Sequence, residues 1–369
     1  MTAKGQTIIT LLPGYFLKNS LMINRLVKVL PNPGEKLKNS KIFIIGYDFL
    51  TRIFSSKNKL FSKNFLLIID ESQYISNPNT KIFKVLYQIR KNPNCKGCIL
   101  LTATPILHRP GELWTQVKLI NPSFSISYQK FVDYFKKYDN GFNHYGLKNE
   151  KEFQKLINQY TIFVDYKKAK VKLPKLEIKP IYLEKGFNDR LETSLEKINI
   201  TVEITKKLVK QGEKVLIFAW YRETVLKLKE KLKGQGIISL VYFGGLNHKQ
   251  RKEIIEKFKS DKYQVLIGNI AALGVGANLQ FCKRAIIHDL VWSPEEINQA
   301  IKRIHRIGSK EKVEVYVPLF KEGFDKKLLK NFLEKEDMIK KFKSVDINWR
   351  SVFNVKESLL DKIFKFFKS

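Results

Sequence analysis

Residues 65–73 read FLLIIDESQ, a continuous apolar run that ends in two adjacent carboxylates, Asp70 and Glu71. A short apolar run bounded by polar residues is typical of a strand buried on both faces of a parallel sheet. Such a strand would deliver both carboxylates to the carboxyl edge of the sheet, where open α/β folds hold their ligands. In nucleotide hydrolases, a first carboxylate at this place holds Mg²⁺ and its neighbour polarises the attacking water. Taken alone, the run is equally consistent with a strand that ends in a solvated acidic turn.

Short apolar runs that alternate with helix-like segments surround this stretch. Such alternation predicts a parallel sheet with helices on its faces. In the first half the predicted strands are Ile8–Leu12, Ile42–Ile45, Phe65–Ile69 and Ile99–Leu101, and the predicted helices are Leu21–Leu30 and Lys81–Arg90. In the second half the predicted strands are Val215–Ala219, Ile238–Tyr242, Val265–Gly268, Ala285–His288 and Val313–Val317.

The length of 369 residues exceeds what one typical hydrophobic core holds, which predicts two domains. After Glu112 the alternation gives way to aromatic, lysine-rich helical segments and then to a proline-punctuated stretch, Val171–Pro180, predicted to be the linker. We therefore predict an α/β protein with two tandem parallel-sheet domains, residues 1–182 and 183–369. The amphipathic segment Val355–Phe367 predicts a helix that closes the second domain, or alternatively a surface-binding helix.

The composition is strongly basic, with 68 Lys and Arg against 35 Asp and Glu and a formal net charge of +33. A surplus of this size repels itself unless a polyanion neutralises it, and nucleic acid is the expected polyanion. A composition rich in Lys, Asn and Ile also fits an AT-biased genome. Three cysteines do not build a disulfide framework, and no apolar stretch approaches the length of a membrane span. The expectation is a soluble, intracellular protein with no membrane partner.

A second polar constellation lies in residues 292–308, which read WSPEEINQAIKRIHRIG. Ser293, Pro294 and Glu296 predict a capping box with proline at the first helical position, and Gly308 is placed to end the helix. On such a helix Gln299, Arg303 and Arg306 would share one face and form a donor array suited to phosphate oxygens. The alternative is an ordinary basic surface helix.

Two further loops follow predicted strands. Thr102 and Thr104 belong to the sequence LTATP directly after Ile99–Leu101, where hydroxyls can hydrogen-bond the neighbouring carboxylates. Residues 268–279 read GNIAALGVGANL, and their glycines permit close backbone approach to a phosphate or sugar. Each string alone is also an ordinary turn.

The order and spacing of these motifs resemble the superfamily 2 helicases, and within them the SWI/SNF-type branch of DNA translocases. The branch is indicated by residues 47–50 (YDFL) and by the run from Asp289 to Gly308 (DLVWSPEEINQAIKRIHRIG). Residues 109–116 (RPGELWTQ) resemble the annealing-helicase, or fork-remodelling, members. The resemblance covers residues 8 to 320 and implies two RecA-like domains that close around ATP and Mg²⁺ while moving along double-stranded DNA.

The resemblance also implies roles for individual residues. In the first domain, Asp70 would hold Mg²⁺, Glu71 would activate water, and Gln73, Thr102 and Thr104 would couple the nucleotide site to DNA. In the second domain, the residues implied to line the nucleotide cleft are Gly274, Gly276, Asn278, Gln299, Arg303 and Arg306, the two arginines as fingers on the γ-phosphate.

One departure from the family is large. No G-x-x-x-x-G-K-[ST] phosphate loop occurs in the sequence, and Ile8–Pro13 matches the strand that normally follows that loop and its helix. The resemblance therefore implies an N-terminally truncated first domain and a chain that by itself hydrolyses ATP poorly or not at all. The phosphate loop would come from a separate polypeptide, or the chain would be a degenerate remnant. At a smaller scale, Gln73 stands where the family usually has His.

The leading functional prediction is an ATP-dependent DNA helicase or translocase, with this chain one part of a split enzyme. The alternative is a non-catalytic DNA-binding remnant that keeps the helicase shape, and a third possibility is an RNA-directed helicase. The lean core and AT-biased composition would also suit a phage, a virus or a small-genome organism.

Overall fold

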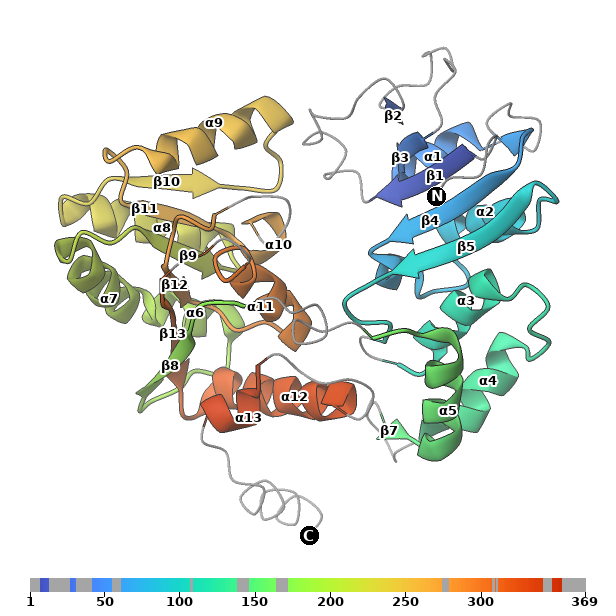
Figure 1. Cartoon of the computed structure of the whole chain (residues 1–369). Helices are drawn as coiled ribbons and strands as arrows, with labels where there is room; N and C mark the ends of the chain where they lie inside the picture. Colours follow the sequence, from blue (N-terminus) through green and yellow to red (C-terminus); the bar gives the residue numbers. More distant parts are fainter. Residues whose placement is uncertain are drawn as a thin grey trace, which may run out of the picture. The chain divides into compact units, whose positions relative to one another are not determined.

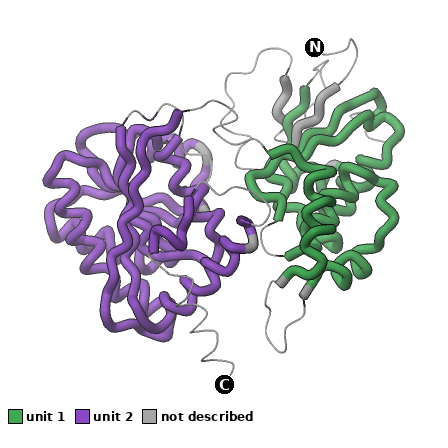
Figure 2. Tube along the Cα trace, turned by 60° about the horizontal axis from the view of Figure 1, so that its bottom comes forward, with its two compact units in different colours: residues 1–163 green, residues 164–369 purple. Residues whose placement is uncertain are grey.

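The computed structural model describes residues 7–12, 27–30, 42–54, 61–106, 109–137, 146–163, 172–273, 279–306, 309, 311–340 and 347–353. The chain divides into two compact units, residues 1–163 and 164–369, coloured separately in Figure 2. Each unit is built on its own parallel sheet (Figure 1).

The sheet of unit 1 has five described strands, all parallel, in the order β2-β3-β1-β4-β5. They are β1 (Thr7–Leu12), β2 (Val27–Leu30), β3 (Ile42–Gly46), β4 (Phe65–Asp70) and β5 (Cys95–Leu101). The four predicted strands are confirmed, but the predicted helix Leu21–Leu30 is wrong in its last four residues. Val27 and Val29 alternate with polar Lys28, a period-2 pattern of β-branched residues that suits a strand, and β2 pairs with β3.

Helices of unit 1 comprise α1 (Tyr47–Ile53), the 3₁₀ turn η2 (Ser72–Ile75) and α2 (Lys81–Arg90), which has the predicted bounds. The predicted helical elaboration comprises α3 (Gly111–Ile120), α4 (Tyr128–Phe135) and α5 (Glu150–Tyr160), with the short pair β6 (Lys136–Lys137) and β7 (Gly146–Leu147) between α4 and α5. The rings of Phe131, Phe135 and Phe153 pack in tilted and edge-to-face arrangements at centroid distances of 4.8 to 6.3 Å and form its small core.

The sheet of unit 2 has six parallel strands in the order β10-β11-β9-β12-β13-β8. They are β8 (Leu176–Leu183), β9 (Val215–Ala219), β10 (Ser239–Tyr242), β11 (Val265–Asn269), β12 (Arg284–Ile287) and β13 (Val313–Phe320). All five predicted strands are present, and β8 is the one that the sequence analysis missed.

Because strand β8 belongs to the second sheet, the boundary between the units lies earlier in the chain than predicted. The register of β8 pairs Leu176 with Val313 and Leu183 with Phe320 in the second sheet, although residues 171–180 were predicted to be linker. The two units therefore divide between Phe163 and Val164, not after residue 182. Pro180 made this stretch resemble a linker in the sequence. A proline is tolerated in β8 because β8 is an edge strand.

The helices of unit 2 are α6 (Arg190–Glu196), α7 (Ile198–Lys210), α8 (Arg222–Gly234), α9 (His248–Lys259), α10 (Ile270–Leu273), α11 (Pro294–Ile301), α12 (Gly323–Lys340) and α13 (Trp349–Val352). Strands β9, β11 and β12 are almost entirely buried, as central strands of a parallel sheet should be. The predicted helix Val355–Phe367 lies outside the described residues. Within the part of the chain that is described, no helix combines the length and apolarity needed to cross a bilayer.

Candidate functional site

Asp70 ends strand β4 at the carboxyl edge of the first sheet, where the sequence placed it. Glu71 follows with φ 51° and ψ 50°, a left-handed conformation that costs a non-glycine residue roughly 1–2 kcal/mol. Only Glu71 and Asn149 adopt a positive φ among the described non-glycine residues. The turn brings the Glu71 amide within 3.0 Å of Asp70 Oδ1, to which it donates. Backbone strain of this kind concentrates at functional sites.

Tyr47 packs against the same turn. Its hydroxyl donates to the Asp70 carbonyl oxygen, so the first residue of α1 is tied to the end of β4. Burial raises the pKa of Tyr47, and the nearby charges of Asp70 and Glu71 raise it further. Tyr47 is therefore a neutral donor beside the two carboxylates. Tyr47 is the second residue after the predicted strand Ile42–Ile45, and in the sequence residues 47–50 pointed only to a family resemblance.

A hydrogen-bonded path leads from Glu71 to the next strand end. Gln73 Nε2 donates to Glu71 Oε2 at 2.6 Å, and Gln73 Oε1 accepts from the Thr102 hydroxyl, also at 2.6 Å. The orientation of the Gln73 amide follows from Glu71, because an ionised carboxylate only accepts hydrogen bonds. The sequence predicted that these hydroxyls bond the carboxylates directly, but the Thr102 hydroxyl donates to Gln73 instead. Gln73 bridges the gap.

Thr104 extends the path along the backbone. Its amide donates to Thr102 Oγ1 at 3.0 Å, and its side chain is 1% exposed. Among the described residues, Thr104 Oγ1 has no hydrogen-bond partner. A second tie lies alongside, because Gln116 on α3 donates to the Pro105 carbonyl oxygen and accepts from the Ser72 hydroxyl at 3.0 Å. The loops after β4 and β5 are thus fastened to each other and to α3.

The chemistry of this edge fits a hard divalent cation. Burial raises the pKa of the Asp70 carboxyl, while the hydrogen bond from the Glu71 amide lowers it. A cation at the carboxylate would stabilise its ionised form. No group of three or more metal-ligating His, Cys, Asp or Glu side chains occurs among the described residues. Mg²⁺ in proteins keeps most of its water and is bound through one or two carboxylates, the type of ligand that Asp70 supplies.

In unit 2 the predicted helix is shorter than expected. α11 begins at Pro294 as predicted, but Ser293 makes no side-chain capping bond, so the predicted capping box is absent. The helix ends at Ile301 instead of continuing to Gly308. From there the chain tightens into turns, in which the Arg303 amide donates to the Ala300 carbonyl and the Ile304 amide to the Ile301 carbonyl.

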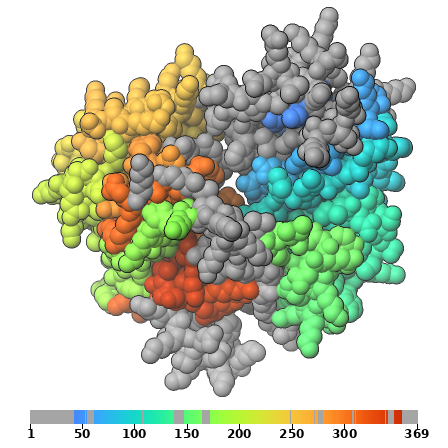
Figure 3. Space-filling model, viewed as in Figure 1, coloured from blue at the N-terminus to red at the C-terminus, as the bar shows by residue number. Residues whose placement is uncertain are grey.

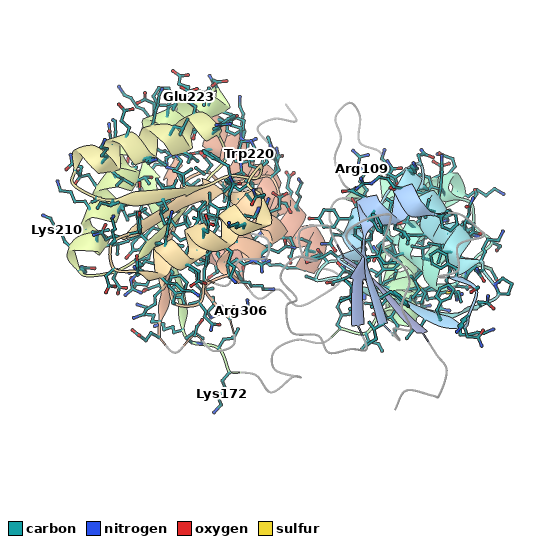
Figure 4. All side chains as sticks on the ribbon, turned by 90° about the horizontal axis from the view of Figure 1, so that it is seen from above. Arg109, Lys172, Lys210, Trp220, Glu223 and Arg306 are labelled. Carbon is teal, nitrogen blue, oxygen red and sulfur yellow. The ribbon has the colours of Figure 1, made fainter. Side chains whose placement is uncertain are left out.

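Two contacts explain this early end. Ile304 is fully buried in the core of unit 2, and His305 Nε2 lies 2.8 Å from the Pro174 carbonyl oxygen. Of the predicted phosphate-binding residues, only Gln299 lies on α11. Arg303 is half-buried in the turn, and Arg306 is exposed beyond it (Figure 4). The prediction that Gln299, Arg303 and Arg306 share one helical face is therefore wrong. Gly274, Gly276, Asn278 and Gly308 lie outside the described residues.

A buried polar network, which the sequence analysis missed, supports the carboxyl edge of the second sheet. Asp289, two residues after β12, accepts from the Trp220 amide at 2.8 Å and from the Ser194 hydroxyl at 3.0 Å. Lys197, 1% exposed, lies 3.7 Å from Asp289 and 3.2 Å from Asp325. Trp220 follows β9, so the network joins two neighbouring strand ends. In the sequence, the only signal for this network is weak, namely an acidic residue directly after the predicted strand Ala285–His288.

Charge balance inside the network is well defined. Burial alone would raise the pKa of Asp289, but the neighbouring His288, the Lys197 ammonium and the hydrogen bonds from Trp220 and Ser194 bring it below its usual range. Burial lowers the pKa of His288, whose Nε2 lies 2.8 Å from the Ser194 carbonyl oxygen and whose Nδ1 lies 2.8 Å from the Thr201 hydroxyl. His288 is therefore a neutral imidazole that donates from Nε2 and accepts at Nδ1.

Two features of the chain are typical of two-domain helicases. One is the carboxylate pair at a strand end of the first sheet, and the other is the Gln/Arg segment after a strand of the second sheet. Residues 20–233 match the SNF2-related domain, and residues 196–308 match the helicase conserved C-terminal domain. The first match covers more than half of the chain, and the chain belongs to the SNF2-related family.

The chain is also similar to three named proteins. An uncharacterized ATP-dependent helicase of Mycoplasma genitalium is 28% identical over 85% of this chain and 34% of its own length. A SWI/SNF-related matrix-associated actin-dependent regulator of chromatin subfamily A-like protein 1 of Xenopus tropicalis is 26% identical over 79% of this chain and 34% of its own. Human DNA annealing helicase and endonuclease ZRANB3 is 24% identical over 79% and 31%, respectively. The chain spans about a third of the length of these relatives. The predicted SWI/SNF-type resemblance is confirmed.

Proposed function

We propose that this chain is the motor core of an ATP-driven translocase on double-stranded DNA. The path from Glu71 through Gln73 to Thr102 supports the proposal most directly. It joins the carboxylate that would activate water to the strand end next to it. In this proposal, a change in the position of Glu71 alters its hydrogen bond with Gln73 and, through Gln73, the position of the loop that carries Thr102 and Thr104.

In this proposal Asp70 holds Mg²⁺ and Glu71 orients the attacking water. Asp70 Oδ1 accepts from the Glu71 amide, and no described residue donates to its Oδ2, which leaves that oxygen for a cation or its water. Bound Mg²⁺ would neutralise charge on the phosphate oxygens of ATP. The left-handed turn at Glu71 holds the second carboxylate beside the first, and Gln73 fixes its side chain through Oε2.

Unit 2 would contribute the arginines. Arg303 and Arg306 lie in the turns after α11, and Gln299 lies on the helix itself. In this proposal the two guanidiniums act as fingers on the γ-phosphate of ATP. Arginine fingers in related phosphoryl transfers contribute about 10³ to 10⁵ in rate. Gly274 and Gly276 remain proposed members of this cleft.

Three observations support DNA as the partner. The net charge is +33, the chain belongs to the SNF2-related family, and one relative is named a DNA annealing helicase. Neutralising phosphates releases counterions, so binding should weaken as salt rises. The Gly-rich phosphate loop that ATP turnover also needs would come from a polypeptide outside these residues, because no G-x-x-x-x-G-K-[ST] occurs among them.

The test measures duplex DNA, duplex RNA and Mg·ATP binding to the purified chain, with and without an added phosphate-loop polypeptide. We expect salt-dependent binding that favours DNA, and nucleotide binding that Asp70→Asn abolishes while DNA affinity stays unchanged. Asp133→Asn, an exposed carboxylate of the same unit, is the matched control. A chain that binds DNA but no nucleotide under any of these conditions would be the non-catalytic remnant. Preference for duplex RNA would contradict the proposal.

A further inference from the structure

Residues 72–111 contain no Asp or Glu, although they carry six Lys and Arg. Most of these cations belong to α2 and to the turn that leads from α2 into β5. The inner side of α2 is apolar and buried, whereas the outer side and the residue after the helix carry exposed lysines, namely Lys81, Lys84 and Lys91. The outer side of α2 is therefore a positively charged surface of unit 1.

Lysines of two neighbouring elements extend this surface. Lys96 is exposed, and its Nζ donates to the Pro93 carbonyl oxygen at 2.9 Å in the turn after α2. Figure 3 shows cyan atoms of this stretch of the chain at the surface of unit 1. On α3, Lys118 Nζ lies 5.6 Å from the centre of the Tyr87 ring, as does Lys91 Nζ. We call the surface made by Lys81, Lys84, Tyr87, Lys91, Lys96 and Lys118 the α2 face.

The α2 face is held on rigid elements. Arg90 ties the end of α2 to the end of α3, because its Nε donates to the Leu119 carbonyl oxygen at 2.9 Å and its Nη2 to that of Ile120 at 3.2 Å. The Tyr87 ring stacks on buried Phe83 at a centroid distance of 6.0 Å and an interplanar angle of 6°. The cations of the α2 face therefore project from positions that folding has already fixed.

The α2 face has no counter-charge within the described part of the chain. None of its five lysines forms an ion pair with a described carboxylate. Lysines on the surface of unit 2 differ, since Lys227 pairs with Glu223 and Lys259 with Glu256, both at 2.8 Å. Like charges that gather around one ring repel each other, and a bound anion would relieve that repulsion. The α2 face is thus a site for a polyanion from outside the chain.

The composition of the α2 face fits a nucleic acid better than an acidic protein. Protein interfaces are depleted in lysine and carry apolar and aromatic residues at their centre. The exposed residues between 81 and 96 are Lys, Gln and Pro, and lysine, glutamine and tyrosine side chains are typical contacts of phosphate oxygens. The phosphate backbone of a nucleic acid is therefore the expected polyanion.

The same residues favour a duplex over a single strand. Proteins bind single strands by stacking bases on free aromatic rings. Tyr87 is the aromatic residue of the α2 face, but its ring already stacks on Phe83 and has the ammonium groups of Lys91 and Lys118 beside it. The α2 face thus offers charges to a backbone and no free ring to a base.

The α2 face also lies apart from the candidate site. α2 starts after the carboxyl end of β4 and leads back to the amino end of β5, and Figure 1 shows it behind these two strands. Lys96 is the second residue of β5, whereas Leu101, the last, pairs with Asp70. Five residues of a strand span roughly 16 Å. The α2 face therefore covers the flank of the sheet and reaches the end opposite to the carboxylates.

We propose that the α2 face binds the phosphate backbone of a second stretch of duplex DNA, in addition to the stretch on which the motor acts. The contact is independent of sequence, because phosphate contacts carry no base information. It keeps the chain on DNA during the part of the cycle in which the motor releases its own stretch. This inference rests on the proposed function, since it adds a second contact with the same partner.

The first test locates the contact on the full chain. Lysines are acetylated with N-acetoxysuccinimide in the presence and absence of a DNA duplex of about 12 base pairs, roughly 40 Å long, and the products are quantified by mass spectrometry. We expect the duplex to slow acetylation of Lys84, Lys91 and Lys96 at least threefold. Lys227 and Lys259 are internal controls and should react at unchanged rates.

The second test measures binding of the same duplex to a variant that combines Lys84→Gln, Lys91→Gln and Lys96→Gln. Each phosphate contact adds about 0.9 to the slope of log affinity against log salt, so the slope of this variant should be smaller by about 2 to 3. The wild type should bind two short duplexes at low salt, and the variant one.

The matched control combines Lys227→Gln, Lys259→Gln and Lys283→Gln, which removes the same charge from lysines that are paired with carboxylates. This control should keep the wild-type slope and stoichiometry, and circular dichroism verifies that both variants fold.

Four results would overturn the inference. They are unprotected lysines on the α2 face, an unchanged salt slope in its variant, a variant that binds no duplex at all, and equal protection of the α2 face by polyglutamate or by single-stranded DNA. The third result would make the α2 face the chain's sole DNA surface, and the fourth would assign it to a different partner. Failure of Mg·ATP binding would contradict the proposed function instead, and it would leave the protection of the α2 face by DNA intact.

Discussion

Gln73 Nε2 lies 2.6 Å from Glu71 Oε2 and donates a hydrogen bond to it. The opposite end of the same amide accepts from Thr102 at 2.6 Å, so one half-exposed carboxylate and one strand-end hydroxyl share a single buried side chain. Glutamine is suited to this bridge because its two ends differ, one donating and one accepting. Unlike a histidine, glutamine carries no charge that changes with pH.

The bridge predicts energetic coupling between Gln73 and Thr102. In a double-mutant cycle with Gln73→Leu and Thr102→Val, we expect a coupling energy of about 1 kcal/mol in urea unfolding, the usual net value of a hydrogen bond. The exposed pair Gln154 and Asn158, 3.0 Å apart, is the control and should couple more weakly. Additive effects for Gln73 and Thr102 would show that the bridge does not form in solution.

The left-handed backbone at Glu71 predicts an unusual order of variant stabilities. Glu71→Ala and Glu71→Gly remove the same carboxylate, but only glycine adopts φ 51° without strain. We expect the glycine variant to be more stable than the alanine variant by about 1 kcal/mol in urea unfolding. At a helical position the order would be reversed. Equal stabilities, or a more stable alanine variant, would mean that Glu71 is not held in this conformation.

Lys197 should be among the costliest residues of unit 2 to replace. Lys197→Met leaves the Asp289 and Asp325 carboxylates buried without their cation, which should cost about 3–5 kcal/mol of unfolding free energy. Lys227→Met is the control, because Lys227 forms an exposed ion pair with Glu223 and should contribute less than about 0.5 kcal/mol. Figure 4 labels Glu223. A loss at Lys197 no larger than at Lys227 would contradict the buried network.

His288 predicts how stability depends on pH. Its folded pKa is lowered by burial, whereas the unfolded value is near 6.5, so between these values the unfolded chain binds more protons. The stability from neutral His288 is therefore complete above about pH 6.5 and declines as the pH falls toward the folded value. The slope is at most about 1.4 kcal/mol per pH unit for one proton. His288→Gln should flatten urea-unfolding stability between pH 7 and 5.5, and an unchanged slope would contradict the buried neutral imidazole.

The strands of both sheets were readable from the sequence because continuous apolar runs leave few alternatives. Two exceptions have clear causes. Val27–Leu30 is a short edge strand next to a helix-like pattern, and the Pro180 of β8 suggested a linker, although proline is accepted at a sheet edge. Edge strands carry weak periodicity, so their pairing decides their structure.

Within the site, the sequence located Asp70, Glu71, Gln73 and Thr102, all of which end or follow strands. It could not show that Gln73 mediates the contact, because hydrogen-bond geometry depends on the turn at Glu71. The helical face with Arg303 failed for a different reason. Burial of Ile304 and the contact of His305 with Pro174 end α11 early, and both are tertiary contacts between distant parts of the sequence.

The most direct test of the central claim is ATP turnover by the chain supplied with an added phosphate-loop polypeptide, measured with and without duplex DNA. We predict turnover that rises on addition of DNA and falls at least a hundredfold in Glu71→Gln, with duplex affinity unchanged. The claim that this chain is an ATP-driven motor core would be contradicted by turnover that is unchanged in Glu71→Gln. It would also be contradicted by a verified complex that binds DNA yet hydrolyses no ATP.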